Sequence, residues 1–191
     1  MNVWDIADQG TIVHEFQEIF SMPVSCIKLF ARICEEDGKE VKKSIIAAGS
    51  LSGAFKLFWL ISAQNLITIP AAHESFINNL SYSKEFDKLI TSSSDGTAKI
   101  WDLANLTTSK ELMKIKPVLV EEGQTPTPVD FVVSDVLFHP VEHNHVVLVA
   151  ESTQLCVADL ARGGRVIRCF EVGDTKEAGG RFVAACFSKS A

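Results

Sequence analysis

A histidine, a serine and an aspartate lie within one short segment, residues 73–102, and these side-chain types could form a hydrolytic site. In such a site His73 would take the proton of the Ser93 hydroxyl while Asp95 orients the imidazole. Nothing in the segment indicates an exposed nucleophile or an oxyanion hole. We therefore interpret the set as structural, and we predict that the chain is not an enzyme and has no catalytic residue.

A second cluster of potentially reactive side chains lies in residues 139–145, which contain His139, Glu142, His143 and His145. A zinc site needs three or four ligands in a fixed arrangement, supported by neighbouring hydrogen bonds. Here the cluster falls on a predicted loop between two strands. We expect a solvated loop, with no metal and no cofactor.

Composition limits the classes of protein to which the chain can belong. It has 191 residues, of which 47% are hydrophobic and 22% charged, and its net charge is −6 (18 basic minus 24 acidic residues). Such an apolar fraction can fill a core. The acidic balance argues against direct nucleic-acid binding, which needs a concentrated excess of Lys and Arg. No apolar stretch reaches the ~20 residues that span a bilayer, so no membrane partner is expected.

The five cysteines, at positions 26, 34, 156, 169 and 186, are odd in number, and none is spaced as a Cys-x-x-Cys pair. Four of them lie in apolar runs, where a reduced cysteine behaves as a small hydrophobic residue. A disulfide framework would show denser, paired spacing. This pattern favours reduced thiols inside a cell.

Short apolar runs recur between turn residues, and this pattern indicates β-strands. These strands must position the polar residues described above. Examples are residues 44–48, 88–92, 145–150 and 165–170, each of ordinary strand length. The turns between them are rich in Ser, Gly, Asp and Asn, which tolerate the conformations of tight hairpins. No long stretch has helical periodicity. An all-β chain follows.

The strands belong to repeats, since the dipeptide Trp4-Asp5 occurs again as Trp101-Asp102. Two degenerate copies place Phe58 and Ala158 where the tryptophan is expected. The four positions are separated by 54, 43 and 57 residues. The middle spacing matches the ~40–45 residue period of WD40 repeats, and loops lengthen the other two.

Residues 73–102 closely resemble a WD40 repeat. In that family a His before the first strand, a Ser or Thr in the second, an Asp in the tight turn and a Trp in the third form a hydrogen-bonded tetrad. The resemblance assigns these roles to His73, Thr91, Asp95 and Trp101, with Ser93 as the alternative hydroxyl. Physically, a buried indole N–H needs an acceptor and a buried carboxylate needs donors, and His can link the two.

The predicted fold is a WD40 β-propeller, present as an incomplete arc of three full blades and two partial ones. Residues 1–20 end one blade, 25–70 form a degenerate blade, 73–116 the well-formed blade, 117–132 a loop, 133–172 another blade, and 181–191 start the next. Propellers close with four to eight blades. We therefore expect either part of a longer product or an arc that a partner completes.

The order of degenerate and well-formed repeats resembles the Smu-type splicing-associated WD40 proteins. Three stretches carry the likeness: residues 73–78 with 93–101, residues 132–170, and the Gly-Gly-x-Phe-Val sequence at 179–183. The resemblance implies a non-enzymatic scaffold of the spliceosome, located in the nucleus, with protein partners that include a RED-like protein. That family also carries an N-terminal helical LisH/CTLH region, which this sequence does not contain.

The expected function is therefore a protein-interaction scaffold in pre-mRNA splicing. The alternative is a WD40 adaptor in another pathway, such as a ubiquitin-ligase substrate receptor or a signalling scaffold, for which a cytoplasmic location would be expected. In either case we expect partners to contact loops at one end of the blades, such as Glu74, Ser75 and Phe76.

Overall fold

The computed structural model describes residues 1–5, 7, 10–17, 19–104, 110–116, 118–119, 125, 127–128, 131–142, 144–150, 154–171 and 184–187. In this part of the chain the main architecture is three four-stranded antiparallel sheets. The first contains β3 (Val24–Glu36), β4 (Lys39–Ser50), β5 (Phe55–Trp59) and β6 (Asn65–Ile69). The second contains β7 (Ile77–Ser83), β8 (Lys88–Ser93), β9 (Ala98–Asp102) and β10 (Lys110–Ile115). The third contains β13 (Val133–Phe138), β14 (His145–Ala150), β15 (Gln154–Asp159) and β16 (Arg165–Glu171).

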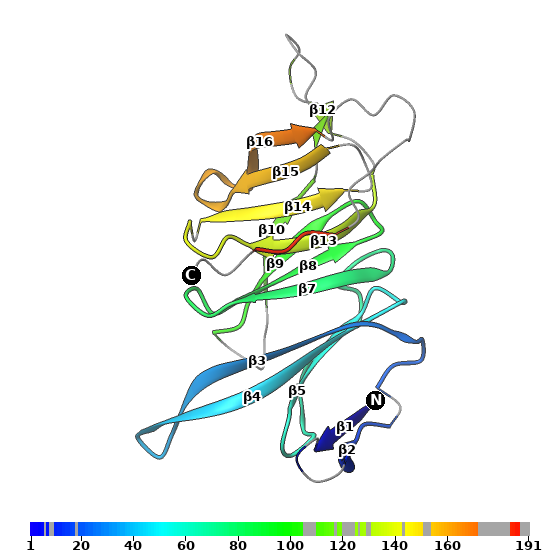
Figure 1. Ribbon diagram of the computed structural model, residues 1–191, viewed down its shortest axis with the longest axis vertical. Coiled ribbons are helices and arrows are strands. Elements are labelled where there is room, and N and C mark those ends of the chain that lie inside the picture. Colours follow the sequence, from blue (N-terminus) through cyan, green and yellow to red (C-terminus); the bar gives the residue numbers. More distant parts are fainter. Residues whose placement is uncertain are drawn as a thin grey trace.

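The three sheets are successive blades of an open arc. Each is a meander in which neighbours along the chain pair in the sheet, and the first strands β3, β7 and β13 lie beside one another (Figure 1). This arrangement confirms the predicted all-β propeller present as an incomplete arc. A short 3₁₀ turn, η1 (Leu160–Arg162), joins β15 to β16.

The segments before, between and after the blades hold shorter elements. β1 (Asn2–Asp5) pairs with β2 (Thr11–Glu15) as a two-stranded sheet. Residues 117–132, which we predicted to be a loop, contain a minimal ladder of β11 (Val118–Leu119) and β12 (Thr127–Pro128). A proline is tolerated there because both strands of a two-stranded sheet are edge strands. Of the predicted strand at 181–191, residues 184–187 are described; they are not in a strand, although the Ala185 amide donates to Asp135 Oδ2 at 3.0 Å.

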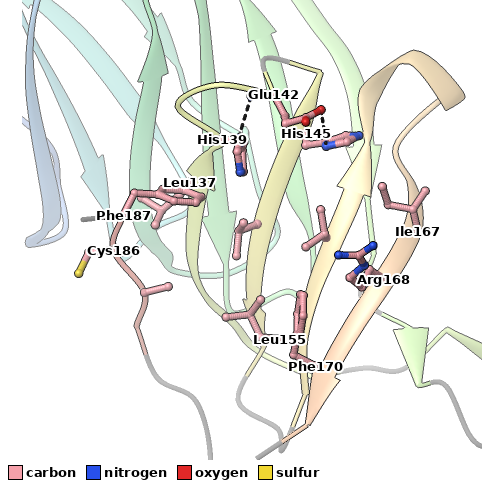
Figure 2. Close-up of a pocket in the computed structure, with 13 residues that line it drawn as sticks. Leu137, His139, Glu142, His145, Leu155, Ile167, Arg168, Phe170, Cys186 and Phe187 are labelled. Atoms are coloured by element: carbon pink, nitrogen blue, oxygen red, sulfur yellow. Dashed lines mark hydrogen bonds and ion pairs between the residues drawn. The ribbon is translucent and has the colours of Figure 1, made fainter. Parts of the chain in front are cut away.

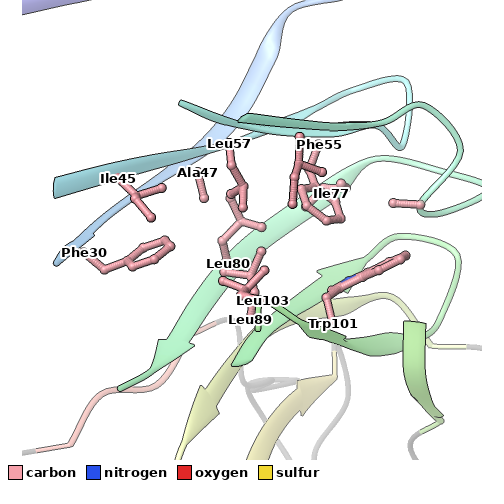
Figure 3. Packing of buried hydrophobic residues seen from close by; sticks show 12 residues of the cluster. Phe30, Ile45, Ala47, Phe55, Leu57, Ile77, Leu80, Leu89, Trp101 and Leu103 are labelled. Carbon is pink, nitrogen blue, oxygen red and sulfur yellow. The ribbon is translucent and has the colours of Figure 1, made fainter. Parts of the chain in front are cut away.

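Apolar side chains fill the space between neighbouring blades (Figure 3). Between the first two blades Phe55 meets Trp101 edge to face, with ring centroids 5.0 Å apart. The cluster at this interface comprises Phe30, Ile45, Ala47, Phe55, Leu57, Ile67, Ala72, Ile77, Leu80, Leu89, Trp101 and Leu103. Separate clusters lie between the second and third blades and between the first blade and residues 16–20. Each blade therefore depends on its neighbour for burial, as expected of a repeat architecture.

Two tight turns explain local features of the first blade. Asp37 and Gly38 both have positive φ, 51° and 72°, which suits the two-residue turn that joins β3 and β4. Gly53, with φ of 78°, stands at the turn between β4 and β5, where an added Cβ would lie 2.2 Å from the His73 carbonyl oxygen. Gly53 also binds that residue directly, since the His73 amide donates to the Gly53 carbonyl at 2.9 Å.

Strands β3 and β4 extend well beyond the rest of their blade. Their ladder continues from Ala31↔Ser44 to Glu36↔Lys39, whereas β5 pairs with β4 only from Ile45 onwards. We call residues 31–44 the β3–β4 arm; it forms the long blue and cyan projection in Figure 1.

The arm is held against the second blade on one side. Arg32 donates from Nε to Asp87 Oδ2 at 2.9 Å, and Tyr82 Oη donates to Asp87 Oδ1 at 2.9 Å. Next to this contact, the ring of Phe30 stacks on Tyr82 with centroids 4.0 Å apart. These side chains come from β3 and from β7 with its following turn, so the arm has a fixed direction.

Among the described residues, no helix is long and apolar enough to cross a membrane.

Candidate functional site

The side chains of His73, Thr91, Asp95 and Trp101 form one hydrogen-bonded chain in the second blade. Asp95 Oδ2 lies 2.9 Å from His73 Nδ1, and an ionised carboxylate only accepts, so Nδ1 carries the proton. His73 Nε2 then accepts from Thr91 Oγ1 at 2.6 Å, and Thr91 Oγ1 accepts from Trp101 Nε1 at 3.0 Å. Every polar atom along this path has a partner with matching donor or acceptor character.

Strand pairing positions these four residues. Thr91 lies in β8 and Trp101 in β9, on adjacent antiparallel strands. Asp95 lies in the turn between the same strands, and the His73 backbone is held to the first blade through Gly53. The alternation of side chains along β8 turns Thr91 to the histidine.

Ser93, the alternative hydroxyl, lies outside the chain of bonds. It is fully buried and its Oγ donates to the Ser75 carbonyl at 3.3 Å while accepting from the Asp95 amide at 3.0 Å. Thr91 is fully buried as well. Neither hydroxyl faces solvent beside the imidazole, and the hydrogen bonds of both connect strands and turns of the blade.

Burial and hydrogen bonding set the charge states of His73 and Asp95. Burial lowers the pKa of His73, against the opposing attraction of Asp95, and this favours the neutral imidazole. Burial alone would raise the pKa of Asp95, but hydrogen bonds from Thr97, the Glu74 amide and His73, with the His73 charge interaction, lower it below its ordinary value. The carboxylate is thus ionised and fully used as an acceptor.

Thr97 joins the network and Lys99 holds the backbone beside it, and the sequence interpretation missed both. Thr97 donates to Asp95 Oδ1 from its hydroxyl at 2.6 Å and from its amide at 3.0 Å. The spacing of a threonine two residues after an aspartate, typical of a turn that is closed by side chains, was the available signal. Lys99 donates to the Ala72 carbonyl at 2.7 Å and pairs with Glu111 at 3.0 Å; nothing in the local sequence indicated this contact.

The predicted contact loop, residues 74–76, lies directly over the network. The Glu74 amide donates to Asp95 Oδ2 at 3.1 Å, and the Phe76 carbonyl accepts from the Ser94 amide at 2.9 Å. Glu74 is exposed, and the Phe76 side chain remains 47% exposed despite being a large apolar group. The buried tetrad therefore holds the backbone of a loop that presents a carboxylate and an aromatic ring to solvent.

The two Trp-Asp dipeptides occupy comparable strand ends. Trp101 and Asp102 end β9, where Asp102 Oδ1 accepts from the Ala104 amide at 3.0 Å. Trp4 and Asp5 end β1, but their side chains lie outside the described residues. No role beyond strand position is assigned to that first pair.

The histidine cluster of the third blade forms no ligand set in the part of the chain that the structure describes. His139 Nδ1 accepts from the Glu142 amide at 2.8 Å, a bond that helps to close the loop between β13 and β14. His145 lies 3.7 Å from the Glu142 carboxylate, and no three His, Cys, Asp or Glu side chains among the described residues could hold a metal ion together. His143 lies outside those residues.

The cluster instead stands at one end of a groove of about 480 Å³ on the outer face of the third blade (Figure 2). Apolar side chains of β13, β14, β15 and β16, including Leu137, Leu155 and Ile167, form its floor. Phe187 packs edge to face on His139 with centroids 5.0 Å apart. This face of the blade has the apolar character of the inter-blade surfaces described above.

Comparison with known proteins agrees with the geometry. Residues 64–102 match the family model described as WD domain, G-beta repeat. A sequence search of curated proteins gave no match. The chain therefore contains a WD40 repeat, set in an open arc of propeller blades.

Solved structures extend the likeness of the fold to most of the chain. The computationally designed Ika8 protein is 18% identical over 98% of this chain, with a TM-score of 0.64. U3-55K and the RRP9 WD40 repeats are 12% and 13% identical over 85% of it, each with a TM-score of 0.58. At such identities the likeness shows the fold alone. The chain covers 46%, 42% and 41% of these three solved chains, respectively, which is less than half of each.

Proposed function

We propose that the chain is part of a non-enzymatic protein-interaction scaffold. The observation that carries the proposal is the buried tetrad of a WD40 repeat holding the backbone of residues 74–76, where Glu74 and Phe76 face solvent. A rigidly held loop loses little conformational entropy on binding, which favours its use as a contact surface. A half-exposed aromatic ring beside a charge suits a protein partner better than a small polar metabolite.

We further propose that the scaffold acts in pre-mRNA splicing and is nuclear. The support is the order of the repeats, with a well-formed blade at 73–116, a blade without tryptophan at 133–172 and the Gly-Gly-x-Phe-Val sequence at 179–183, which together resemble the Smu-type proteins. The partners proposed on this basis are spliceosomal proteins, among them a RED-like protein.

Affinity capture from nuclear extract tests both the proposed scaffold function and the proposed role in splicing. The chain should recover protein partners, and Phe76→Ala should reduce the recovered amount, while Val141→Ala, which removes a 75% exposed apolar side chain elsewhere, should not. Partners that bind the two variants equally would overturn the assigned contact loop. Recovery of proteins that have no connection to splicing, together with cytoplasmic localisation of a fluorescent fusion, would overturn the splicing assignment and leave the scaffold itself standing.

A further inference from the structure

Within the β3–β4 arm, strand β4 has no neighbouring strand on the side of β5 among the described residues. Strand β4 begins at Lys39, but its partner β5 ends opposite Ile45, so β4 continues for six residues, 39–44, without a strand on that side among the described residues. The Leu60 amide still donates to the Ser44 carbonyl at 2.9 Å, and residues 60–64 then form the turn to β6, so that no strand lies beside residues 39–43 on this side among the described residues. Six residues of extended backbone span about 20 Å.

The backbone groups on this edge are oriented for pairing. In a β-ladder the N–H and C=O groups of alternate residues point to opposite sides of the strand. Since the Ser44 carbonyl points towards β5, the backbone groups of Glu40 and Lys42 point to the same side. These are the groups that an added strand would use.

A groove runs along this edge. It has a volume of about 500 Å³ and is lined by Val41, Lys42, Lys43, Ser44, Trp59, Ile61, Ser62 and Gln64. The Ile61 side chain is 79% exposed and provides an apolar contact at one side of the groove. The space therefore lies where the third strand of the sheet would continue.

The charge of the lining favours one kind of occupant. Two of the eight lining residues are lysines and none is acidic, in a chain whose net charge is −6. Lys42 and Lys43 lie on opposite faces of β4 because side chains alternate along a strand. The Lys43 ammonium lies 4.9 Å from the centroid of the Trp59 ring, which places it over the same face as that ring. Residues 39–44 of the open edge carry three lysines and one glutamate, Glu40, so the edge is positive overall and either face of an added strand would meet a lysine.

The base of the arm is held in place by contacts with the second blade. Its other strand, β3, is held by the Arg32–Asp87 ion pair and by the stack of Phe30 on Tyr82. A binding edge that is already extended before binding loses less entropy when a partner pairs with it.

We propose that this edge binds an extended acidic peptide of a partner protein by β-strand addition, with the backbone of Glu40 and Lys42 supplying hydrogen bonds and Lys42 and Lys43 meeting acidic side chains. This surface is separate from residues 74–76. Strands β3 and β7 run in the same direction, as the contacts Ser25–Ile77 and Arg32–Asp87 show, so the arm and the loop before β7 lie at opposite ends of the blades. The inference goes beyond the proposed function and stands without it.

Fluorescence anisotropy with a labelled short peptide in which glutamate alternates with valine tests the proposal on the 191-residue chain. The peptide should bind, and a peptide with lysine in place of glutamate should not. Lys42→Glu should weaken binding about tenfold, since charge reversal replaces attraction by repulsion. The matched control is Lys114→Glu, an exposed lysine on the outer strand β10, which should change binding less than about twofold.

The backbone part of the proposal has its own test. Methylating the amide nitrogens of the central peptide residues removes the donors without changing any charge, and it should abolish binding. Retained binding by the methylated peptide would overturn strand addition, and equal binding of acidic and basic peptides would overturn the assigned chemistry. Lysines on edge strands also protect against self-association. A chain that binds no peptide but self-associates when Lys42 is changed to Ala would overturn the proposal in favour of that protective role.

Discussion

The first and second blades are both four-stranded antiparallel sheets, but the centre of the first is apolar and the centre of the second is a polar network. Aligned by strand register, the tetrad positions His73, Thr91, Asp95 and Trp101 of the second blade correspond to Phe20, Ala48, Ser52 and Phe58 of the first. In the first blade Ala48 is fully buried, and Phe58 packs edge to face on Phe16 with centroids 5.3 Å apart. An apolar cluster thus occupies the place of the polar network.

In these two blades the hydrogen-bonded network is either complete or replaced. A buried indole N–H, hydroxyl or imidazole without its partner would cost free energy, whereas replacement of all of them by apolar groups leaves nothing unsatisfied. Both centres also bury an aromatic ring against the preceding segment, Phe55 on Trp101 and Phe16 on Phe58. The aromatic contact between neighbours is therefore shared, and the hydrogen-bonded chain is specific to the second blade.

The largest effect is expected from removing the aromatic ring of the tetrad. Trp101→Ala should lower the free energy of unfolding by about 3–5 kcal/mol, because a large buried side chain is lost. Phe58→Ala should have a smaller effect, since it removes a smaller ring and breaks no hydrogen bond. Urea unfolding followed by circular dichroism measures both. An unchanged transition for Trp101→Ala would contradict the packing and the hydrogen bond together.

Exchanging one residue pair between the blades tests the comparison directly. Thr91→Ala leaves Trp101 Nε1 without its acceptor and should cost about 1–3 kcal/mol. The reverse exchange, Ala48→Thr, puts a hydroxyl into an apolar centre and should also destabilise, by about 1–3 kcal/mol. If Ala48→Thr were neutral, the two centres would not differ as described. The same unfolding measurement applies.

A smaller effect is expected where the β3–β4 arm meets the second blade. Arg32→Gln should cost about 1 kcal/mol, because the Arg32 and Asp87 side chains are 15% and 29% exposed and their ion pair is partly screened. The matched control is Arg162→Gln, whose side chain is 70% exposed in its pair with Asp159 and which should have almost no effect. Equal losses in the two variants would show that the arm contact contributes no more than a surface pair.

The smallest effect near neutral pH is expected from the titration of His73. Its pKa is lowered in the folded state, so the unfolded chain binds the proton more readily below the ordinary value of 6.5. The free energy of unfolding should therefore decrease as the pH falls below 6.5. Asp95, whose pKa is also lowered, should add a further loss as the pH falls below 3.8.

The variant His73→Gln isolates this contribution. It should be less stable at neutral pH but should lose less additional stability between about pH 6.5 and pH 5, since glutamine does not titrate. Equal pH dependence of the variant and the unchanged chain would mean that the histidine is not kept neutral by burial. The first blade offers no titratable group at Phe20, Ala48 or Phe58, so it should contribute nothing to this slope.

Much of the fold and part of the site could be predicted from the sequence, because their signals are local. Alternating apolar residues and turn residues indicated the strands, and the spacing of Trp101 from Phe58 indicated the repeats. The family resemblance assigned the tetrad hydroxyl to Thr91 and kept Ser93 as the alternative, because both residues lie on the same strand face and no local pattern separates them.

Periodicity and turn chemistry act between residues close along the chain, so the sequence alone indicates the repeat, the residue types of the tetrad and the series of blades. The packing of the strands, in contrast, sets the bond between Thr91 and His73 and brings Arg32 to Asp87 across 55 positions. It also makes β4 longer than β5, which leaves an open edge beside Lys42 and Lys43. These features depend on where one strand ends relative to another and on which side chains the packing of blades brings together. No local pattern encodes such distances.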